Sequence, residues 1–154
     1  MMNSLRLPIH ILWIFGLAFM VLAGCERLAD PYSAEAYKQA TSLKARSLAL
    51  VAKGTEPYSK HEQMADALLI DAASAFEFAK GRGKEASQTA AKQWAIIVDP
   101  NGGSLGDFVA QWRKAPNQRM GQFFVDEFSE ILSVQFDRII ELETGRRSTS
   151  SGEG

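Results

Sequence analysis

The sequence predicts an all-α fold: a four-helix bundle with one short additional helix, preceded by a cleaved signal peptide. Apolar residues recur every three or four positions in four long segments, which is the spacing of one face of an α-helix. Turns containing glycine or proline separate these segments, and short connections favour antiparallel packing of neighbouring helices. Ala95–Val98 is the only run with the composition of a strand, and it ends a helical pattern.

The first two predicted helices are bounded by capping residues and glycines. The first should begin at Asp30-Pro31 or at Ser33, since Asp and Ser are good N-caps, and should end before Gly54. The second opens with Ser59 and Glu62, which have the spacing of a capping box, and ends at Gly81. The expected apolar faces are Ala36, Ala40, Leu43, Ser47 and Leu50 in the first helix and Met64, Leu68, Ala72, Ala75, Phe76 and Ala79 in the second.

The third and fourth predicted helices are separated by a strong turn signal. The third runs from about Lys84 to Val98, and the glycine-rich turn 99–103 ends it. Ser104 then caps a short helix that closes at Ala115-Pro116. Their buried candidates are Ala86, Ala90, Ala91, Trp94, Ile97 and Val98 in the third helix and Leu105, Phe108, Val109 and Trp112 in the short one.

The last predicted helix begins after Asn117, as its cap, and runs to about Glu143. Its main apolar stripe is expected to be Phe124, Phe128, Ile131, Gln135, Ile139 and Leu142. Further large apolar residues fall outside this stripe, and a helix that is apolar around its circumference is usually central. The helical domain should therefore span residues 32–143, and the Ser/Thr/Gly-rich tail 144–154 should be disordered.

The N-terminal segment has the three parts of a secretory signal. Arg6 lies in a short polar start, an apolar run extends from Ile11 to Leu22, and small residues follow it. The apolar run is shorter than the roughly 20 residues of a transmembrane helix. We therefore expect residues 1–24 to be a signal peptide and residues 25–31 to be a short tether.

The end of this segment, Leu22-Ala23-Gly24-Cys25, resembles the lipobox of bacterial lipoproteins. The resemblance implies that Cys25 receives a diacylglyceryl group and becomes the acylated first residue. Ala23 and Gly24 are small enough to let the peptidase reach the backbone, and the cysteine supplies the sulfur nucleophile. The membrane, reached through this anchor, is then one partner of the chain, and the covalent lipid is its only expected cofactor.

The residue after the cysteine bears on the destination. In the enteric lipoproteins that the lipobox resembles, Asp at this position favours retention in the inner membrane. Here the residue is Glu26. In a host with two membranes we therefore expect the chain on the periplasmic face of the outer membrane.

Composition excludes several classes of protein. The formal net charge of −1 argues against binding to nucleic acid, which requires a basic face. A single cysteine cannot form an internal disulfide, so the domain must be stabilised by packing. The apolar fraction of 46% is ordinary for a globular protein.

The residues that carry catalysis or bind metal are sparse. His61 is the only histidine outside the signal, and we expect it to be a solvated residue in a capping turn. Four carboxylates could in principle share a metal inside a bundle, but di-iron bundles use Glu-x-x-His motifs, which are absent here. We predict no catalytic site and no metal site, and we assign to solvated faces Asp66, Asp71, Glu127 and Glu130.

The aromatic residues are the remaining candidates for a site. Trp94 and Trp112 flank the 99–103 turn, and Phe123 lies on the last helix. Core packing is the favoured interpretation of such rings. The alternative is that Trp94, Trp112 and Phe123 contribute to a surface for a partner protein or an apolar ligand.

These observations favour a non-enzymatic interaction module at the cell envelope. The lack of catalytic residues and the short tether suggest a membrane-anchored domain that binds another envelope protein. Two alternatives stay open. One is a carrier of an apolar ligand in a cavity between helices, and the other is a cell-wall enzyme that uses carboxylates alone.

Overall fold

The described part of the chain is all-helical. A computed structural model describes residues 33–82 and 85–144, and within these ranges there are five α-helices, two short 3₁₀ helices and no strand. The predicted signal peptide, the tether and the tail after Thr144 lie outside the described residues. The elements are α2 (Ala34–Val51), η2 (Tyr58–Lys60), α3 (Glu62–Gly81), α4 (Glu85–Val98), α5 (Leu105–Lys114), η3 (Pro116–Gln118) and α6 (Gln122–Glu143).

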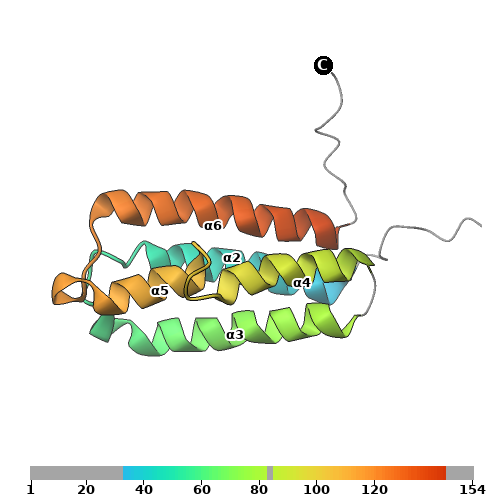
Figure 1. Ribbon diagram of the computed structural model, residues 1–154, viewed down its shortest axis with the longest axis horizontal. Helices are drawn as coiled ribbons and strands as arrows, with labels where there is room; N and C mark the ends of the chain where they lie inside the picture. Colours follow the sequence, from blue (N-terminus) through green and yellow to red (C-terminus); the bar gives the residue numbers. More distant parts are fainter. Residues whose placement is uncertain (1–32, 83–84, 145–154) are drawn as a thin grey trace, which may run out of the picture.

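The helices run along one long axis, and the chain reverses direction between α2 and α3, between α3 and α4, and between α5 and α6 (Figure 1). Helix α2 packs against α3 and α6, and α4 packs against the same two helices. Helices α4 and α5 follow one another along this axis, so together they extend beside the full length of α3 (Figure 1). Ser33 and the end of α6 lie at one end of the molecule, and the α5–α6 connection lies at the other (Figure 1).

Close backbone contact at Gly106 sets the junction between α4 and α5. A Cβ atom at this position would lie 2.4 Å from the carbonyl oxygen of Val98 and 2.8 Å from that of Asp99. Only glycine therefore lets the first turn of α5 pack on the end of α4. Ser104 precedes α5, but its hydroxyl donates to Oε1 of Gln135 instead of capping the helix.

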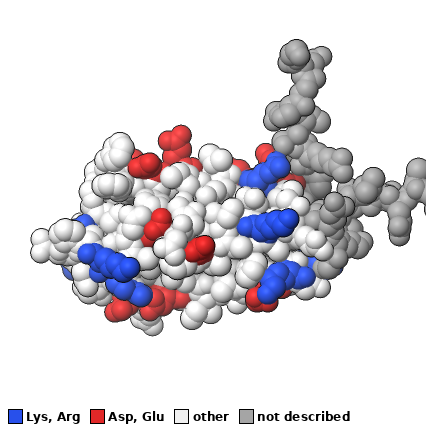
Figure 2. Space-filling view, in the orientation of Figure 1, with Lys and Arg blue, Asp and Glu red and all other residues white. Residues whose placement is uncertain are grey.

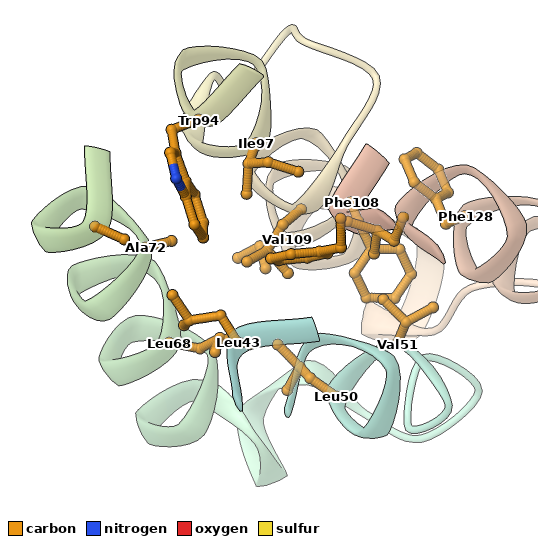
Figure 3. Packing of buried hydrophobic residues seen from close by; sticks show 14 of the residues in the cluster. Leu43, Leu50, Val51, Leu68, Ala72, Trp94, Ile97, Phe108, Val109 and Phe128 are labelled. Atoms are coloured by element: carbon orange, nitrogen blue, oxygen red, sulfur yellow. The ribbon is translucent and has the colours of Figure 1, made fainter. Parts of the chain in front are cut away.

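The core changes in character along the molecule. Helix α3 buries small residues, with Ala65, Ala72, Ala75 and Ala79 all at most 3% exposed, and such residues let neighbouring helices approach closely. Large rings fill the part near α5, where Phe108 lies 5.3 Å from Phe128, measured between ring centroids. Figure 3 shows side chains from α2, α3, α4 and α5 pointing into the shared interior, among them Leu43, Leu68, Trp94, Ile97 and Phe108.

Two predicted caps are wrong. Helix α3 begins at Glu62, after the η2 turn, and its N-cap is His61, which makes no side-chain capping bond. The backbone N–H of Ser59 instead donates to the side chain of Gln118. The N-cap of helix α6 is Gly121 and not Asn117. Asn117 lies within η3 and has a φ of 53°. In both places a 3₁₀ turn stands where the sequence suggested the first turn of an α-helix.

The predicted apolar stripe of α6 is rotated relative to the buried face. The buried face consists of Val125, Phe128, Leu132, Phe136, Ile139 and Glu143. Of the predicted stripe only Phe128 and Ile139 belong to it, while Phe124 is 49% exposed. Because Phe123 and Val134 are also exposed, at 73% and 65%, α6 is not enclosed by the other helices as we expected.

Two phenylalanines of α6 test this assignment directly. Phe128 is 6% exposed, and Phe128→Ala should lower the free energy of unfolding by about 3–5 kcal/mol because it leaves a cavity beside Phe108. Phe123 is 73% exposed, and Phe123→Ala should change the same quantity by less than about 0.5 kcal/mol. Urea unfolding followed by circular dichroism measures both, and equal losses would show that the buried face of α6 is misassigned.

Candidate functional site

The predicted site residues are not brought together. Trp94 is 2% exposed and Trp112 is fully buried, whereas Phe123 is 73% exposed. Both tryptophans therefore belong to the core, as the favoured interpretation of these rings had it, and of the three residues only Phe123 is exposed. The lipobox residues Leu22, Ala23, Gly24 and Cys25 lie outside the described part of the chain.

Trp112 organises the end of the molecule that carries the α5–α6 connection. Its indole Nε1–H donates to the carbonyl oxygen of Glu56 at 3.0 Å. The edge of the ring system meets Tyr58, with ring centroids 5.4 Å apart. These contacts hold the segment between α2 and α3 against α5.

His61 is more buried than the sequence suggested. Its side chain is 13% exposed and stacks on Trp112 with 5.7 Å between ring centroids. Its Nε2 lies 3.0 Å from the carboxylate of Glu56. This hydrogen bond, together with one from Lys53, lowers the pKa of the Glu56 carboxyl below its ordinary value of 4.5.

A second polar contact lies beside this pair. The guanidinium of Arg113 donates to the hydroxyl of Tyr58 at 2.6 Å and to the carboxylate of Asp66 at 3.0 Å. The hydrogen bond to Tyr58 is the main cause of a raised pKa of Arg113, and the nearby carboxylates add to it. Arg113 thus joins the end of α5 to η2 and α3.

These polar groups are arranged to hold loops in place. Among the described residues, no three His, Cys, Asp or Glu side chains are grouped so that they could hold a metal ion. The four carboxylates considered from the sequence are dispersed, since Asp66 pairs with Arg113 and Asp71 pairs with Arg46. Glu127 and Glu130 lie together on the surface of α6 instead.

An apolar groove lies next to the polar cluster, where α5 meets α6. It has a volume of about 390 Å³ and is open to solvent. Its apolar lining includes Pro116, Met120 and Phe124, and two cationic side chains, Lys114 and Arg119, also line it. The full lining is Gln111, Lys114, Ala115, Pro116, Arg119, Met120, Gly121 and Phe124.

The turn that borders the groove is held by hydrogen bonds to the segment that joins α2 to α3. The backbone N–H of Met120 donates to the carbonyl oxygen of Gly54, and the guanidinium of Arg119 donates to that of Thr55. A Cβ at Gly54 would lie 2.8 Å from Val125, so glycine permits this close approach. Asn117 and Gln118 both have positive φ, which costs about 1 kcal/mol or more at each residue unless surrounding contacts compensate.

Two aromatic rings extend the groove onto the start of α6. Phe123 and Phe124 are 73% and 49% exposed, and their rings meet edge to face with 5.8 Å between centroids. Figure 2 shows uncharged surface at the start of α6, blue Lys and Arg side chains elsewhere at the same end of the molecule, and acidic side chains farther along α6. We call this region the tip surface and define it as Lys114, Pro116, Arg119, Met120, Phe123 and Phe124.

The sequence reasoning missed most of the tip surface. It placed Phe124 in the core and did not consider Lys114, Arg119 or Met120. The available signal was the excess of apolar residues on the last helix, since one side of a helix cannot bury all of them. Phe123 is the only member that the sequence analysis offered as part of a partner or ligand surface.

No protein-family model, curated protein sequence or solved structure matches this chain. Within residues 33–82 and 85–144, no helix is both long and apolar enough to span a membrane.

The Glu56–His61 pair predicts a specific dependence of stability on pH. Because the pKa of Glu56 is lowered in the fold, its carboxylate stabilises the protein above pH 4.5, and this stabilisation disappears as the pH falls through the folded pKa. Glu56→Gln should therefore lower the thermal midpoint at neutral pH and leave it unchanged in strong acid.

Glu127→Gln is the matched control, because Glu127 is exposed and makes no ion pair or hydrogen bond within the described residues. Thermal melts of the three proteins between neutral and acidic pH measure the effect. A loss at Glu56→Gln that persists unchanged at the lowest pH would refute the assigned role of the carboxylate.

Proposed function

We propose that this chain is a lipid-anchored, non-enzymatic interaction module of the bacterial cell envelope, built as a four-helix bundle whose third helix is interrupted at 99–104. Its tip surface binds another envelope protein. The observation that carries this proposal is the pair of exposed rings, Phe123 and Phe124, beside an apolar groove. Contiguous exposed apolar surface of this kind marks interaction sites in soluble domains.

The composition of the tip surface supports a protein partner. Aromatic residues, methionine and arginine are enriched at protein interfaces, and the tip surface contains all three kinds. The turn that borders the groove is held by hydrogen bonds to Gly54 and Thr55, so the surface is formed before a partner arrives. Preformed surfaces lose less conformational entropy on binding.

Two other functions receive less support from the structure. A carrier of an apolar ligand needs an enclosed cavity, and the groove at the tip is open. A carboxylate enzyme needs paired acids in a cleft. Asp66 and Asp71 are each neutralised by an arginine, and Glu127 and Glu130 line only a shallow pocket that is open to solvent.

The proposed anchor fits the position of the tip surface. The lipobox ends at Cys25, and the described fold begins at Ser33, at the end of the molecule opposite the tip (Figure 1). The intervening segment can extend at most about 3.3–3.6 Å per residue, so it keeps the domain near the bilayer. We place the protein on the periplasmic face of the outer membrane in a host with two membranes, because Glu26 follows the cysteine.

Lipidation at Cys25 is directly testable. Mass spectrometry of the protein extracted from membranes should find an acylated Cys25 as the first residue. Cys25→Ala should abolish both acylation and cleavage at this site, so that the unprocessed chain, which keeps residues 1–24, accumulates. A Cys25→Ala protein that is still cleaved before residue 25 and bound to membranes would overturn the proposed anchor.

Photo-crosslinking tests the binding surface. A photoreactive phenylalanine analogue at position 123 should yield a crosslink to a second envelope protein in living cells, identified by mass spectrometry. The same analogue at Ile70, which is 66% exposed on α3, is the control and should yield none. Equal yields at both positions, or no crosslink from position 123 to any other protein, would contradict the proposed role of the tip.

A further inference from the structure

A second apolar surface lies on α6 next to the tip. It is a shallow pocket of about 490 Å³ lined by Glu127, Glu130, Ile131, Val134 and Gln135. Val134 is 65% exposed. Neither Glu127 nor Glu130 makes an ion pair or a hydrogen bond to any described residue. We call this surface the acidic strip.

The tip surface has the opposite charge. Lys114 makes no ion pair or hydrogen bond within the described ranges, and Arg119 donates only to the carbonyl oxygen of Thr55. No carboxylate lines the groove. An uncompensated cationic and apolar surface at the end of α5 and the turn before α6 thus adjoins an uncompensated anionic and apolar one on α6.

The two surfaces also share one side of α6. Phe124, Ile131 and Val134 are separated by seven and three residues, which places them on one face of the helix together with Glu127. This face is separate from the buried one that contains Val125 and Phe128. A single straight partner helix could therefore contact both surfaces at once.

We propose that the occupant of this face is the same face of a second copy of the chain, in a reciprocal antiparallel pair. The two-fold axis passes near Phe124. In that register Glu130 of one copy lies opposite the turn that contains Arg119 in the other. Each acidic strip meets a tip surface, and the two-fold symmetry forms this contact twice.

Other occupants within the chain fit poorly. The segment 145–154 follows the end of α6, at the opposite end of the molecule from the tip (Figure 1). Its sequence, GRRSTSSGEG, has no apolar side chain larger than glycine to fill the groove. Its arginines would also face Lys114 and Arg119 with like charge.

The pair would be weak because its interface is small. The paired surface comprises a few side chains around α6, and interfaces below about 1,200 Å² are typical of transient complexes. In this pair the two starts of α2 point away from each other. The inference rests on the proposed function in using the tip as a binding surface, and it names a second copy as one partner.

Charge reversal tests the pairing. The full chain, purified from membranes in detergent, should show concentration-dependent association in sedimentation velocity. One variant reverses the tip cations, Lys114→Glu with Arg119→Glu, and another reverses the strip, Glu127→Lys with Glu130→Lys. Each alone should weaken self-association at least about tenfold. Lys38→Glu, near the opposite end, should leave it unchanged.

An equimolar mixture of the two reversed variants should associate as strongly as the parent, because opposite charges again face each other across both contacts. Restored association also shows that both variants are folded. A parent that stays monomeric at all concentrations, or a mixture that does not recover, overturns the reciprocal pair.

The outcome separates this inference from the proposed function. Crosslinking of position 123 to a different envelope protein, with a monomeric parent, leaves the interaction module intact and eliminates the self-pair. Association that the mixture restores, with crosslinks only between copies, supports the pair and eliminates the second envelope protein.

Discussion

The hydrogen bond from the buried indole of Trp112 to the backbone of Glu56 is the contact on which this end of the molecule depends. A buried tryptophan needs an acceptor for its N–H, and here the acceptor belongs to the segment that joins α2 to α3. That segment is therefore held against α5. Its carbonyl oxygens at Gly54 and Thr55 then bind the turn before α6. The turn that borders the groove is therefore linked to the buried ring of Trp112 through the segment that joins α2 to α3.

The interruption between α4 and α5 makes this arrangement possible. A continuous helix along the third position would bury one uniform face, as the alanine-rich α3 does. The break at 99–104 instead lets α5 start again with its own orientation, and Gly106 allows the two helix ends to touch. Helix α5 buries Phe108 and Trp112 while presenting Lys114 at its exposed end. The packing of the core and the charge at the tip are thus set by the same short helix.

The spacing of apolar residues was sufficient to predict the helices. It did not predict where some of them begin or which side of α6 is buried. Alanine and leucine spacings located the buried face of α2, whereas α3 also carries exposed apolar residues, among them Ile70 and Met64, which the spacing had placed on the apolar face. On α6 apolar residues occur on several sides, so spacing alone could not distinguish the buried Val125 from the exposed Phe124. The local chemistry of Ser59 and Asn117 fits a helix cap, whereas the structure uses 3₁₀ turns bound by distant groups such as Gln118. The tip surface depends on such long-range contacts, which no local pattern records.

The opposite placement of Ser33 and the tip surface has an electrostatic consequence for the anchored protein we propose. Helix α6 has 22 residues, so at 1.5 Å per residue the two ends of the molecule are separated by about 33 Å. At physiological ionic strength the Debye length is about 8 Å. With the domain upright on its tether, Lys114 and Arg119 would lie several screening lengths above the headgroups. Their charge would then be hidden from the anionic lipids of their own bilayer and fully available to whatever approaches from the other side.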